Sequence, residues 1–335
     1  MTRPLTFMFA AALLAGCASK PITPDWVDGQ AAKYPAGQYL IGRGSASTSE
    51  QAQERARADL AKIFQVAVAA ESEDVQSFSR DSANGAAGGQ YEERTARRIT
   101  TRTEQIVRGI RIAELWQDPA TKTHHALAVL QRLPAANALR EEINRLDAAT
   151  RQYVQQSRAA SDVFVKIGAA SRAIESQTER EGFQRSLKVV DITGRGIESE
   201  FSSSQLIADR DALLKRVRIS PRIPAGADPE LESIVRGALA ASGFLTEGGD
   251  KPDFVLEARM TLNDLGRKEG WYWQRGSIEV TLIEAAANRV RGTKSWTIKG
   301  SALNAVEARQ RALQEADSML KKDLRRTLTG FATNG

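Results

Sequence analysis

Few side chains of this chain combine the residue types and spacing that acid–base or metal chemistry needs. The two histidines, His124 and His125, are neighbours in a predicted strand, where successive side chains point to opposite faces, so one metal ion cannot easily bind both. The carboxylate pairs Glu92-Glu93 and Glu141-Glu142 stand among arginines, which is typical of solvated polar faces. Zinc-protease, EF-hand and G-x-S-x-G motifs are absent from the sequence. We therefore predict no catalytic residue, no cofactor and no metal site, and a protein that is not an enzyme.

A glycine pair, Gly42 and Gly44, lies at the end of a predicted strand, where a phosphate-binding loop would begin. The third glycine and the Lys-Ser/Thr pair of such a loop are missing. We therefore interpret the two glycines as residues that shape the end of the strand.

The only cysteine, Cys17, closes an N-terminal segment with the layout of a secretory signal. Arg3 opens the segment, an apolar run follows from Leu5 to Leu14, and small residues precede the cysteine. The run Leu14-Ala15-Gly16-Cys17 resembles the lipobox of bacterial lipoproteins, in which a signal peptidase cuts before the cysteine and the cysteine then carries acyl chains such as palmitate. The alternative is an ordinary signal peptide with a chance cysteine.

The lipobox resemblance implies a signal peptide at residues 1–16 and a lipid-anchored tether at residues 17–23. Each buried acyl CH₂ contributes roughly 0.8 kcal/mol, so several chains on Cys17 would hold the protein on a membrane. By the same resemblance, Ala18 points to the periplasmic face of the outer membrane. No later segment reaches the ~20 apolar residues of a spanning helix, so we expect the protein to be anchored to the membrane without crossing it.

The length and the charge limit the class of protein further. The 335 residues are enough for two domains, and the formal net charge is +6. The basic residues are spread along the chain among acidic ones, whereas a nucleic-acid partner would need a clustered basic face. We therefore predict no nucleic-acid partner.

Residues 24–133 predict a first α+β domain. A strand is expected at residues 39–45, followed by a helix whose apolar stripe comprises Ala52, Ala56, Leu60, Ile63 and Phe64. Another strand is expected after Phe64, and a turn-rich loop at residues 81–89. Strands at residues 107–116 and 125–133 flank a turn at residues 118–122 and should form an antiparallel hairpin.

Residues 134–183 predict a helical hairpin that joins two domains and belongs fully to neither. Their apolar register shifts at residues 159–162, where Ser161 or Asp162 could cap a second helix. One long helix is the alternative.

Residues 184–335 predict a second domain with the order β-α-β-β-β-α. Strands are expected at residues 216–220, 254–263, 271–283 and 293–298, and helices at residues 228–242 and 303–328. The predicted fold class is therefore α+β, with two antiparallel-sheet domains that carry helices on one face and are joined by a helical hairpin.

The first domain resembles the Lpp-twenty family of outer-membrane lipoproteins, whose domain also occurs in the flagellar envelope proteins FlgP and FlgT. The resemblance rests on Pro24-Asp25-Trp26, on residues 39–44, on the alanine-rich helix from Ala52 to Leu60, and on the hairpin from residue 109 to residue 130. The second domain is similar only in element order to the periplasmic modules of the curli-secretion protein CsgG and the peptidoglycan-synthase activator LpoB. Such families imply an envelope scaffold and bring no catalytic motif.

The most unusual aromatic cluster is Trp271-Tyr272-Trp273, which follows Gly270. On a strand, Trp271 and Trp273 share one face and Tyr272 lies on the other. Core packing is one interpretation of the two tryptophans. An exposed platform that binds a partner is the other, because aromatic residues are enriched at binding hot spots.

These observations favour a non-enzymatic outer-membrane lipoprotein that acts as a periplasmic scaffold or adaptor, in flagellar or surface-structure assembly or in cell-wall synthesis. Its expected partners are the membrane, through the lipid on Cys17, and envelope proteins or peptidoglycan; an oligomer is compatible with this role. The alternative is an envelope carbohydrate (peptidoglycan) hydrolase or a glycan-binding protein.

Overall fold

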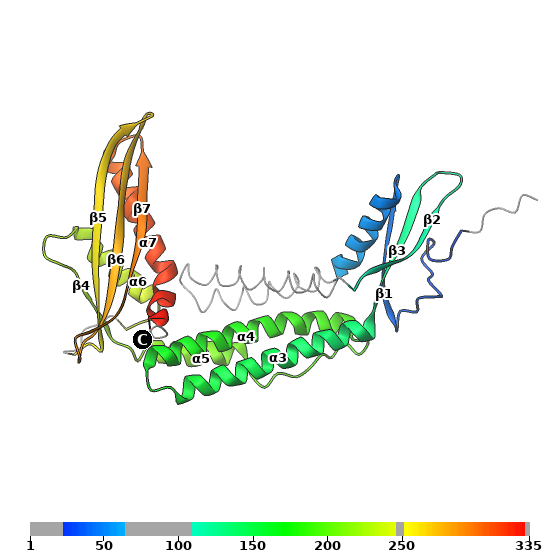
Figure 1. Cartoon of the computed structure of the whole chain (residues 1–335), viewed down its shortest axis with the longest axis horizontal. Coiled ribbons are helices and arrows are strands. Elements are labelled where there is room, and N and C mark those ends of the chain that lie inside the picture. The colour runs from blue at the N-terminus through cyan, green and yellow to red at the C-terminus, as the bar shows by residue number, and fades with distance from the viewer. Residues whose placement is uncertain (1–22, 64–108, 246–250, 332–335) are drawn as a thin grey trace, which may run out of the picture. The chain divides into compact units, whose positions relative to one another are not determined.

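The computed structural model describes residues 23–63, 109–245 and 251–331 (Figure 1). These residues form two compact units, one built from the chain up to Leu60 with Arg111–Val129, and the other from Leu130 onward. The mixture of helices and sheets confirms the α+β class. The signal segment with Cys17, the strand predicted after Phe64, the loop at residues 81–89 and the pair Glu92-Glu93 lie outside the described residues.

The first unit contains a three-stranded sheet in the order β1-β3-β2, formed by β1 (Tyr39–Ala46), β2 (Arg111–Gln117) and β3 (His124–Gln131). Strands β2 and β3 pair antiparallel, which confirms the predicted hairpin. The carboxylate of Asp118 closes the turn by accepting hydrogen bonds from the Ala120 amide and the Thr121 hydroxyl, at 2.8 and 2.7 Å.

A helix at residues 49–63 packs directly on β1. Its predicted stripe is confirmed at Ala52, Ala56 and Leu60, which are fully buried. A Cβ atom at Gly42 or Gly44 would collide with the backbone of this helix, so both glycines are needed for the close approach. The interpretation that they shape a strand end is wrong, because both lie inside β1. Ile63, predicted on the stripe, is 37% exposed.

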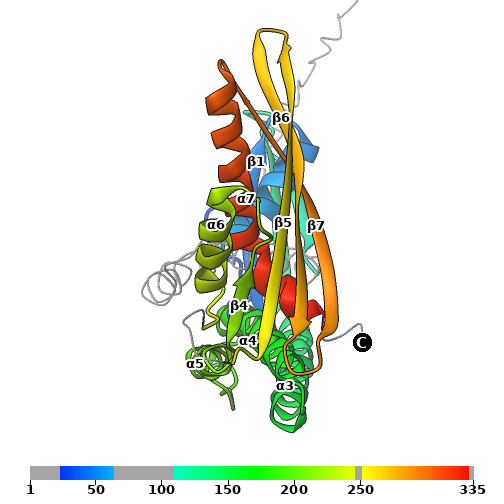
Figure 2. The ribbon, with the colours of Figure 1, turned by 90° about the vertical axis from the view of Figure 1, so that its left-hand side faces the viewer.

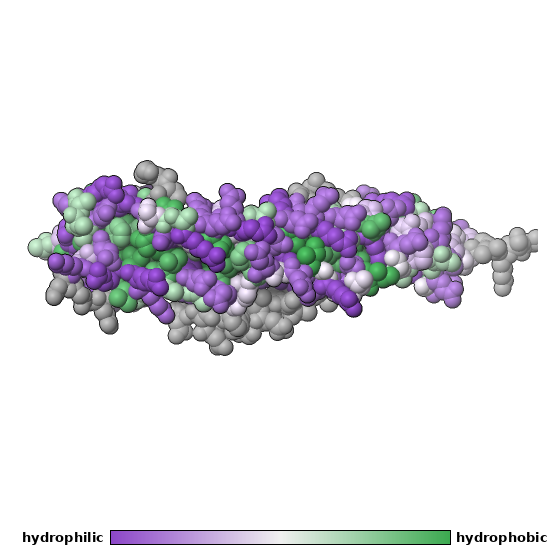
Figure 3. Space-filling view, turned by 90° about the horizontal axis from the view of Figure 1, so that it is seen from below, coloured by the Kyte–Doolittle hydropathy of each residue, from purple (hydrophilic) through white to green (hydrophobic). Residues whose placement is uncertain are grey.

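The following segment forms a helical hairpin of α3 (Arg132–Ala159) and α4 (Val163–Val190). The break lies where the sequence predicts it, because Asp162 caps α4 by accepting hydrogen bonds from the amides of Phe164 and Val165. Helix α4 extends seven residues beyond the expected end at residue 183. Hydrophilic residues cover most of the face on which the hairpin lies, and apolar residues form separate patches there (Figure 3).

Polar side chains of α4 hold the chain that follows it. Arg180, only 2% exposed, donates to Asp147 of α3 at 2.9 Å and to the carbonyl oxygens of Ile197 and Glu198, both at 2.9 Å. Gln177 donates to the carbonyl of Phe201 in the same manner. The held segment leads into α5 (Ser203–Leu214), a helix that the sequence did not predict.

The second unit also contains a four-stranded sheet in the order β4-β5-β6-β7. Its elements are β4 (Ile219–Arg222), α6 (Pro229–Ala241), β5 (Phe254–Lys268), β6 (Trp271–Glu284), β7 (Arg289–Ala302) and α7 (Ala305–Gly330). The predicted order is confirmed. The sheet is mixed rather than purely antiparallel, because β4 pairs parallel to β5, as the intervening helix α6 permits.

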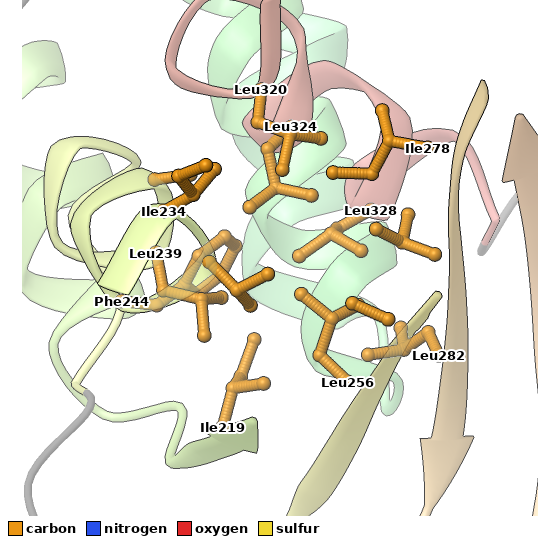
Figure 4. Close-up of a cluster of buried hydrophobic side chains, with 14 of the residues drawn as sticks. Ile219, Ile234, Leu239, Phe244, Leu256, Ile278, Leu282, Leu320, Leu324 and Leu328 are labelled. Carbon is orange, nitrogen blue, oxygen red and sulfur yellow. The ribbon is translucent and has the colours of Figure 1, made fainter. Parts of the chain in front are cut away.

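Helices α6 and α7 lie on the same face of this sheet (Figure 2). Their side chains meet those of the strands in one apolar core, part of which is drawn in Figure 4. Phe164 and Ile167, from the first turns of α4, are fully buried in this core. The hairpin is therefore part of the larger unit, rather than a linker that belongs to neither domain.

Among the residues that the structure describes, no helix is both long enough and apolar enough to cross a membrane.

The substitution Gly44→Ala tests the contact between β1 and the helix. We expect it to lower the free energy of unfolding by about 1 to 3 kcal/mol, because the new methyl group overlaps the helix backbone. Ser45→Ala is the matched control, since Ser45 is exposed on the same strand. Thermal unfolding followed by circular dichroism measures both, and equal stability of the two variants would contradict the contact.

The substitution Arg180→Met tests the buried guanidinium. The substitution removes the donor to the Asp147 carboxylate and to two carbonyl groups, so we expect a loss of about 3 kcal/mol in urea unfolding. Arg145→Met removes an exposed pair with Glu142 and should cost at most about 0.5 kcal/mol. Equal losses in the two variants would show that Arg180 does not hold the segment.

Candidate functional site

Trp271 and Trp273 lie at the start of β6, directly after the turn between β5 and β6. Glu269 and Gly270 form this turn with positive φ angles of 52° and 85°. The indole side chains are not buried, because Trp271 is 42% exposed and Trp273 is 38% exposed. We call these two residues the aromatic platform.

The platform faces away from the helices. Along β6 the residues Ile278, Val280 and Leu282 are fully buried in the core that α6 and α7 cover. Because side chains alternate along a strand, the odd-numbered residues of β6, including both tryptophans, lie on the opposite face. The platform is therefore on the open face of the sheet.

Strand pairing brings cations to the same face. Arg275 lies two residues beyond Trp273 on β6, and Lys299 of β7 is its cross-strand partner. Lys268 is paired with Trp271 and so lies on this face, whereas Arg267 is paired with Tyr272 and lies on the other. A cation near an exposed aromatic ring can bind carboxylates or phosphates while the ring covers an apolar or sugar surface.

Hydroxyl groups continue this face away from the platform. Thr261 and Ser277 form a cross-strand hydrogen bond at 3.1 Å, and Thr281 and Thr293 form another at 3.0 Å. The open face therefore combines aromatic, basic and hydroxyl groups with the carboxylates of Glu257 and Glu279.

Three further exposed apolar side chains lie at the same end of the sheet, and the sequence reasoning missed them. Leu265 is 42% exposed, and Leu303 and Val306 are each 70% exposed. Ala302 pairs with Tyr272, so the turn that carries Leu303 lies beside the start of β6. The available signals were two isolated apolar residues, Leu265 before Gly266 within β5 and Leu303 directly after the end of β7.

The carboxylate of Glu114 in β2 holds other parts of the first unit together. It accepts hydrogen bonds from Lys33 at 2.8 Å, from Tyr34 at 3.1 Å and from the indole of Trp26 at 3.1 Å. The bond from Lys33 is the main reason that the pKa of Glu114 lies below its usual value. A general acid needs a raised pKa, so Glu114 is unsuited to that role.

The pKa values of two other carboxyl groups are also lowered. A hydrogen bond from the Thr121 hydroxyl lowers the pKa of Asp118, and a bond from Arg218 lowers that of Asp253. A shallow hollow of about 450 Å³ on the first unit is lined by hydroxyls, Arg55 and Lys122, and no carboxylate lines it. These groups do not form the carboxylate pair of a glycan hydrolase.

The two histidines and Glu142, which the sequence analysis considered, lie far from the platform in sequence and contact other residues. The ring of His125 packs at a tilt against that of Trp116, with ring centroids 5.3 Å apart, whereas the Nε2 atom of His124 lies 3.2 Å from the side-chain nitrogen of Gln117. Glu142 pairs with Arg145 on α3 at 2.9 Å. Within the described ranges no three His, Cys, Asp or Glu residues gather in a way that could hold a metal ion.

The solved structures that match this chain have low sequence identity and low TM-scores. The secreted protein HP1454 from Helicobacter pylori is 12% identical, with a TM-score of 0.40, over 87% of this chain and 97% of that one. A minor lipoprotein from Acinetobacter baumannii is 17% identical, with a TM-score of 0.26, over 35% of this chain and 92% of that one. A PelC dodecamer from Paraburkholderia phytofirmans is 17% identical, with a TM-score of 0.25, over 33% of this chain and 85% of that one.

No curated protein matches the chain in sequence. A family match covers the N-terminal part, and it begins at the Pro24-Asp25-Trp26 run and ends at the last residue of β3. These bounds include the strand, helix and hairpin on which the resemblance in the sequence rests. Residues 24–131 of this chain are thus a match to the LPP20 lipoprotein family.

Proposed function

We propose that the protein is a non-enzymatic outer-membrane lipoprotein that acts as a periplasmic scaffold or adaptor. The lipoprotein family match of residues 24–131 and the signal layout before Cys17 support a lipid anchor in the envelope. In this proposal acyl chains on Cys17 hold the protein on the periplasmic face of the outer membrane, and the C-terminal sheet presents a binding surface.

The exposure of Trp271 and Trp273 on the open sheet face is the observation that carries the binding role. Large aromatic side chains that lie on a solvent-facing surface beside cations are typical of contact sites for partners. An envelope protein with an acidic surface, or peptidoglycan with its carboxylates, has the complementary chemistry. The role fits the assembly of flagellar or other surface structures, or the synthesis of the cell wall.

A binding role is favoured over the hydrolase that the sequence left as an alternative. A hydrolase needs one carboxyl group with a raised pKa and a second carboxylate about 5 to 9.5 Å away. The surroundings lower the pKa of Glu114, Asp118 and Asp253 instead, each through hydrogen bonds to the charged form.

The anchor is tested by Cys17→Ala in cells fed an alkyne analogue of palmitate. We expect the unchanged protein to be labelled and to fractionate with outer membranes, and the variant to be unlabelled and to keep its signal segment. Ala18→Asp is the matched control, because it should keep the label while moving the protein to the inner membrane. Labelled, normally processed Cys17→Ala protein would refute the anchor.

The platform is tested by the double variant Trp271→Ala, Trp273→Ala with a photocrosslinking amino acid at Thr297, an exposed residue of β7. We expect the main crosslinked adduct in cells to fall at least fivefold. Folding should change by less than about 1 kcal/mol, because both side chains are partly exposed.

The control for this experiment is Val290→Ala, which truncates an exposed apolar residue at the opposite end of β7. It should leave the adduct unchanged. A double variant that crosslinks normally would exclude the platform as the contact site, and one that loses cooperative unfolding would assign the tryptophans to the core.

A further inference from the structure

The shallow hollow on the first unit is built from three segments that are distant in sequence. Ser45 and Ala46 at the end of β1 line it together with Ser47, Arg55 of the helix at residues 49–63, and residues 121–123 of the turn between β2 and β3. All three segments belong to one compact unit. A volume of about 450 Å³ is in the range of sites that hold small ligands.

Arg55 brings a guanidinium group to the hollow. Its Nη1 atom donates to the carbonyl oxygen of Ser45 at 2.6 Å, which fixes the side chain against the end of β1. Within the described ranges Arg55 has no ion pair and no other hydrogen bond of its side chain. A guanidinium carries further N–H donors in a planar fork, and these remain available to a ligand.

Lys122 supplies a second cation from a turn whose backbone is fixed. Its φ angle is 58°, and its amide donates to the carbonyl oxygen of Asp118 at 2.8 Å. Its own carbonyl oxygen accepts a hydrogen bond from the side chain of Gln117 at 3.2 Å. The ammonium group has no ion pair or hydrogen bond in the part of the chain that the structure describes. The turn therefore brings a second positive charge to the same hollow as Arg55.

Two acidic residues of the same segments are bound to other groups. The carboxylate of Asp118 accepts from the Ala120 amide at 2.8 Å and from the Thr121 hydroxyl at 2.7 Å. The carboxylate of Asp59 accepts from the Arg43 amide at 3.0 Å. Neither carboxylate lines the hollow, so the described residues that line it carry two positive charges and no negative one.

Hydroxyl groups complete the lining. Ser45 and Ser47 are exposed, and their hydroxyl groups form no hydrogen bond with another described residue. Thr121 is engaged with Asp118, and Thr123 lies beside it with the two hydroxyl oxygens 3.0 Å apart. Arginine, lysine and hydroxyl side chains are the groups that bind phosphate oxygens in proteins.

We propose that this hollow binds a phosphate group, borne either by a small phosphate ester or by a phospholipid headgroup. The fork of Arg55 donates to two phosphate oxygens, Lys122 neutralises the remaining charge, and the serine hydroxyls donate to the other oxygens. A phosphate monoester carries a charge of about −1.5 to −2 at neutral pH, which two cations match. A carboxylate has a single charge and fewer oxygens, so it would leave donors unused.

This site goes beyond the adaptor function, because it lies on the first unit and uses no residue of the aromatic platform. Its test uses the ¹⁵N-labelled chain from residue 18 onward, made without its signal, and glycerol 3-phosphate as the probe. The backbone amide signals of residues 45–47 and 121–123 should shift in a saturable manner. Glycerol, which lacks the phosphate, should leave these signals unchanged, and equal shifts with both compounds would overturn the proposal.

Vesicles distinguish the two sources of the phosphate. The same chain is sedimented with vesicles of phosphatidylcholine that contain phosphatidylglycerol. Sedimentation that glycerol 3-phosphate reverses would assign a lipid headgroup, whereas amide shifts without sedimentation would assign a small ester. Failure of both probes to bind at residues 45–47 and 121–123 would overturn the site.

Charge variants test the two cations. Arg55→Gln with Lys122→Gln should weaken binding at least about tenfold, because both charge-assisted partners are lost. Arg57→Gln with Lys62→Gln is the matched control, since it removes the same charge from exposed positions of the same helix outside the hollow. The control should bind normally, and equal weakening of the two double variants would show unspecific attraction and refute the site.

A milder variant keeps the test decisive if the first double variant does not fold. Arg55→Lys retains the charge but lacks the planar fork, so it should weaken binding about threefold or more. Unchanged binding would contradict the role of Arg55. Trp271→Ala with Trp273→Ala should bind glycerol 3-phosphate normally, which separates this site from the platform.

Discussion

The fully buried residues of β6, Ile278, Val280 and Leu282, all point to the face that α6, α7 and the first turns of α4 cover. The strands bury most of their apolar side chains in this one layer. On the other face Val255 and Ile283 are buried at one end, whereas most of the remaining residues are polar and at least partly exposed. A sheet with one covered face must present polar residues on the other. The arginines, lysines, threonines and serines of that face meet this requirement, whereas two tryptophans at its end do not. The surface on which the binding proposal depends therefore follows from an asymmetry of burial.

In the first unit, both faces of the sheet are covered. The helix at residues 49–63 covers one face of its sheet, and Trp26 and Tyr34 pack with Leu127 and Val129 on the other. Glu114 holds this second layer in place by accepting hydrogen bonds from Trp26, Lys33 and Tyr34. Among the described residues of this small sheet, Leu115 is a large apolar side chain that stays exposed.

Local signals in the sequence were sufficient for much of this architecture. The cap at Asp162 marks the break between α3 and α4, and Asp228 caps α6 at the residue where the sequence predicts the helix to begin. Alternation along β5 and β6 identified the buried face and placed both tryptophans on one face. The apolar pattern could not decide whether that face is covered, because coverage depends on where distant helices pack.

The features that the sequence missed depend on long-range contacts. The parallel pairing of β4 with β5, the fixation of residues 197–201 by α4 and the closure of β7 by Glu315 and Arg311 each join residues distant in sequence. Helix α5 was missed because only Leu206 and Leu214 of its residues are buried, so no apolar stripe marks it. Gly42 and Gly44 were noticed, but a glycine pattern alone does not show which backbone approaches it.

Helix α7 follows all four strands of its sheet along the chain, and it supplies both side chains that close the edge of β7. During synthesis and export the strands are therefore complete before this protection exists. A premature stop or proteolysis within α7 keeps all four strands. It removes the side chains that bind the outer backbone groups of β7 and the leucines that cover the core. Such a truncated product would expose a long strand edge beside bare apolar surface, which is the combination that drives aggregation in an unfinished protein.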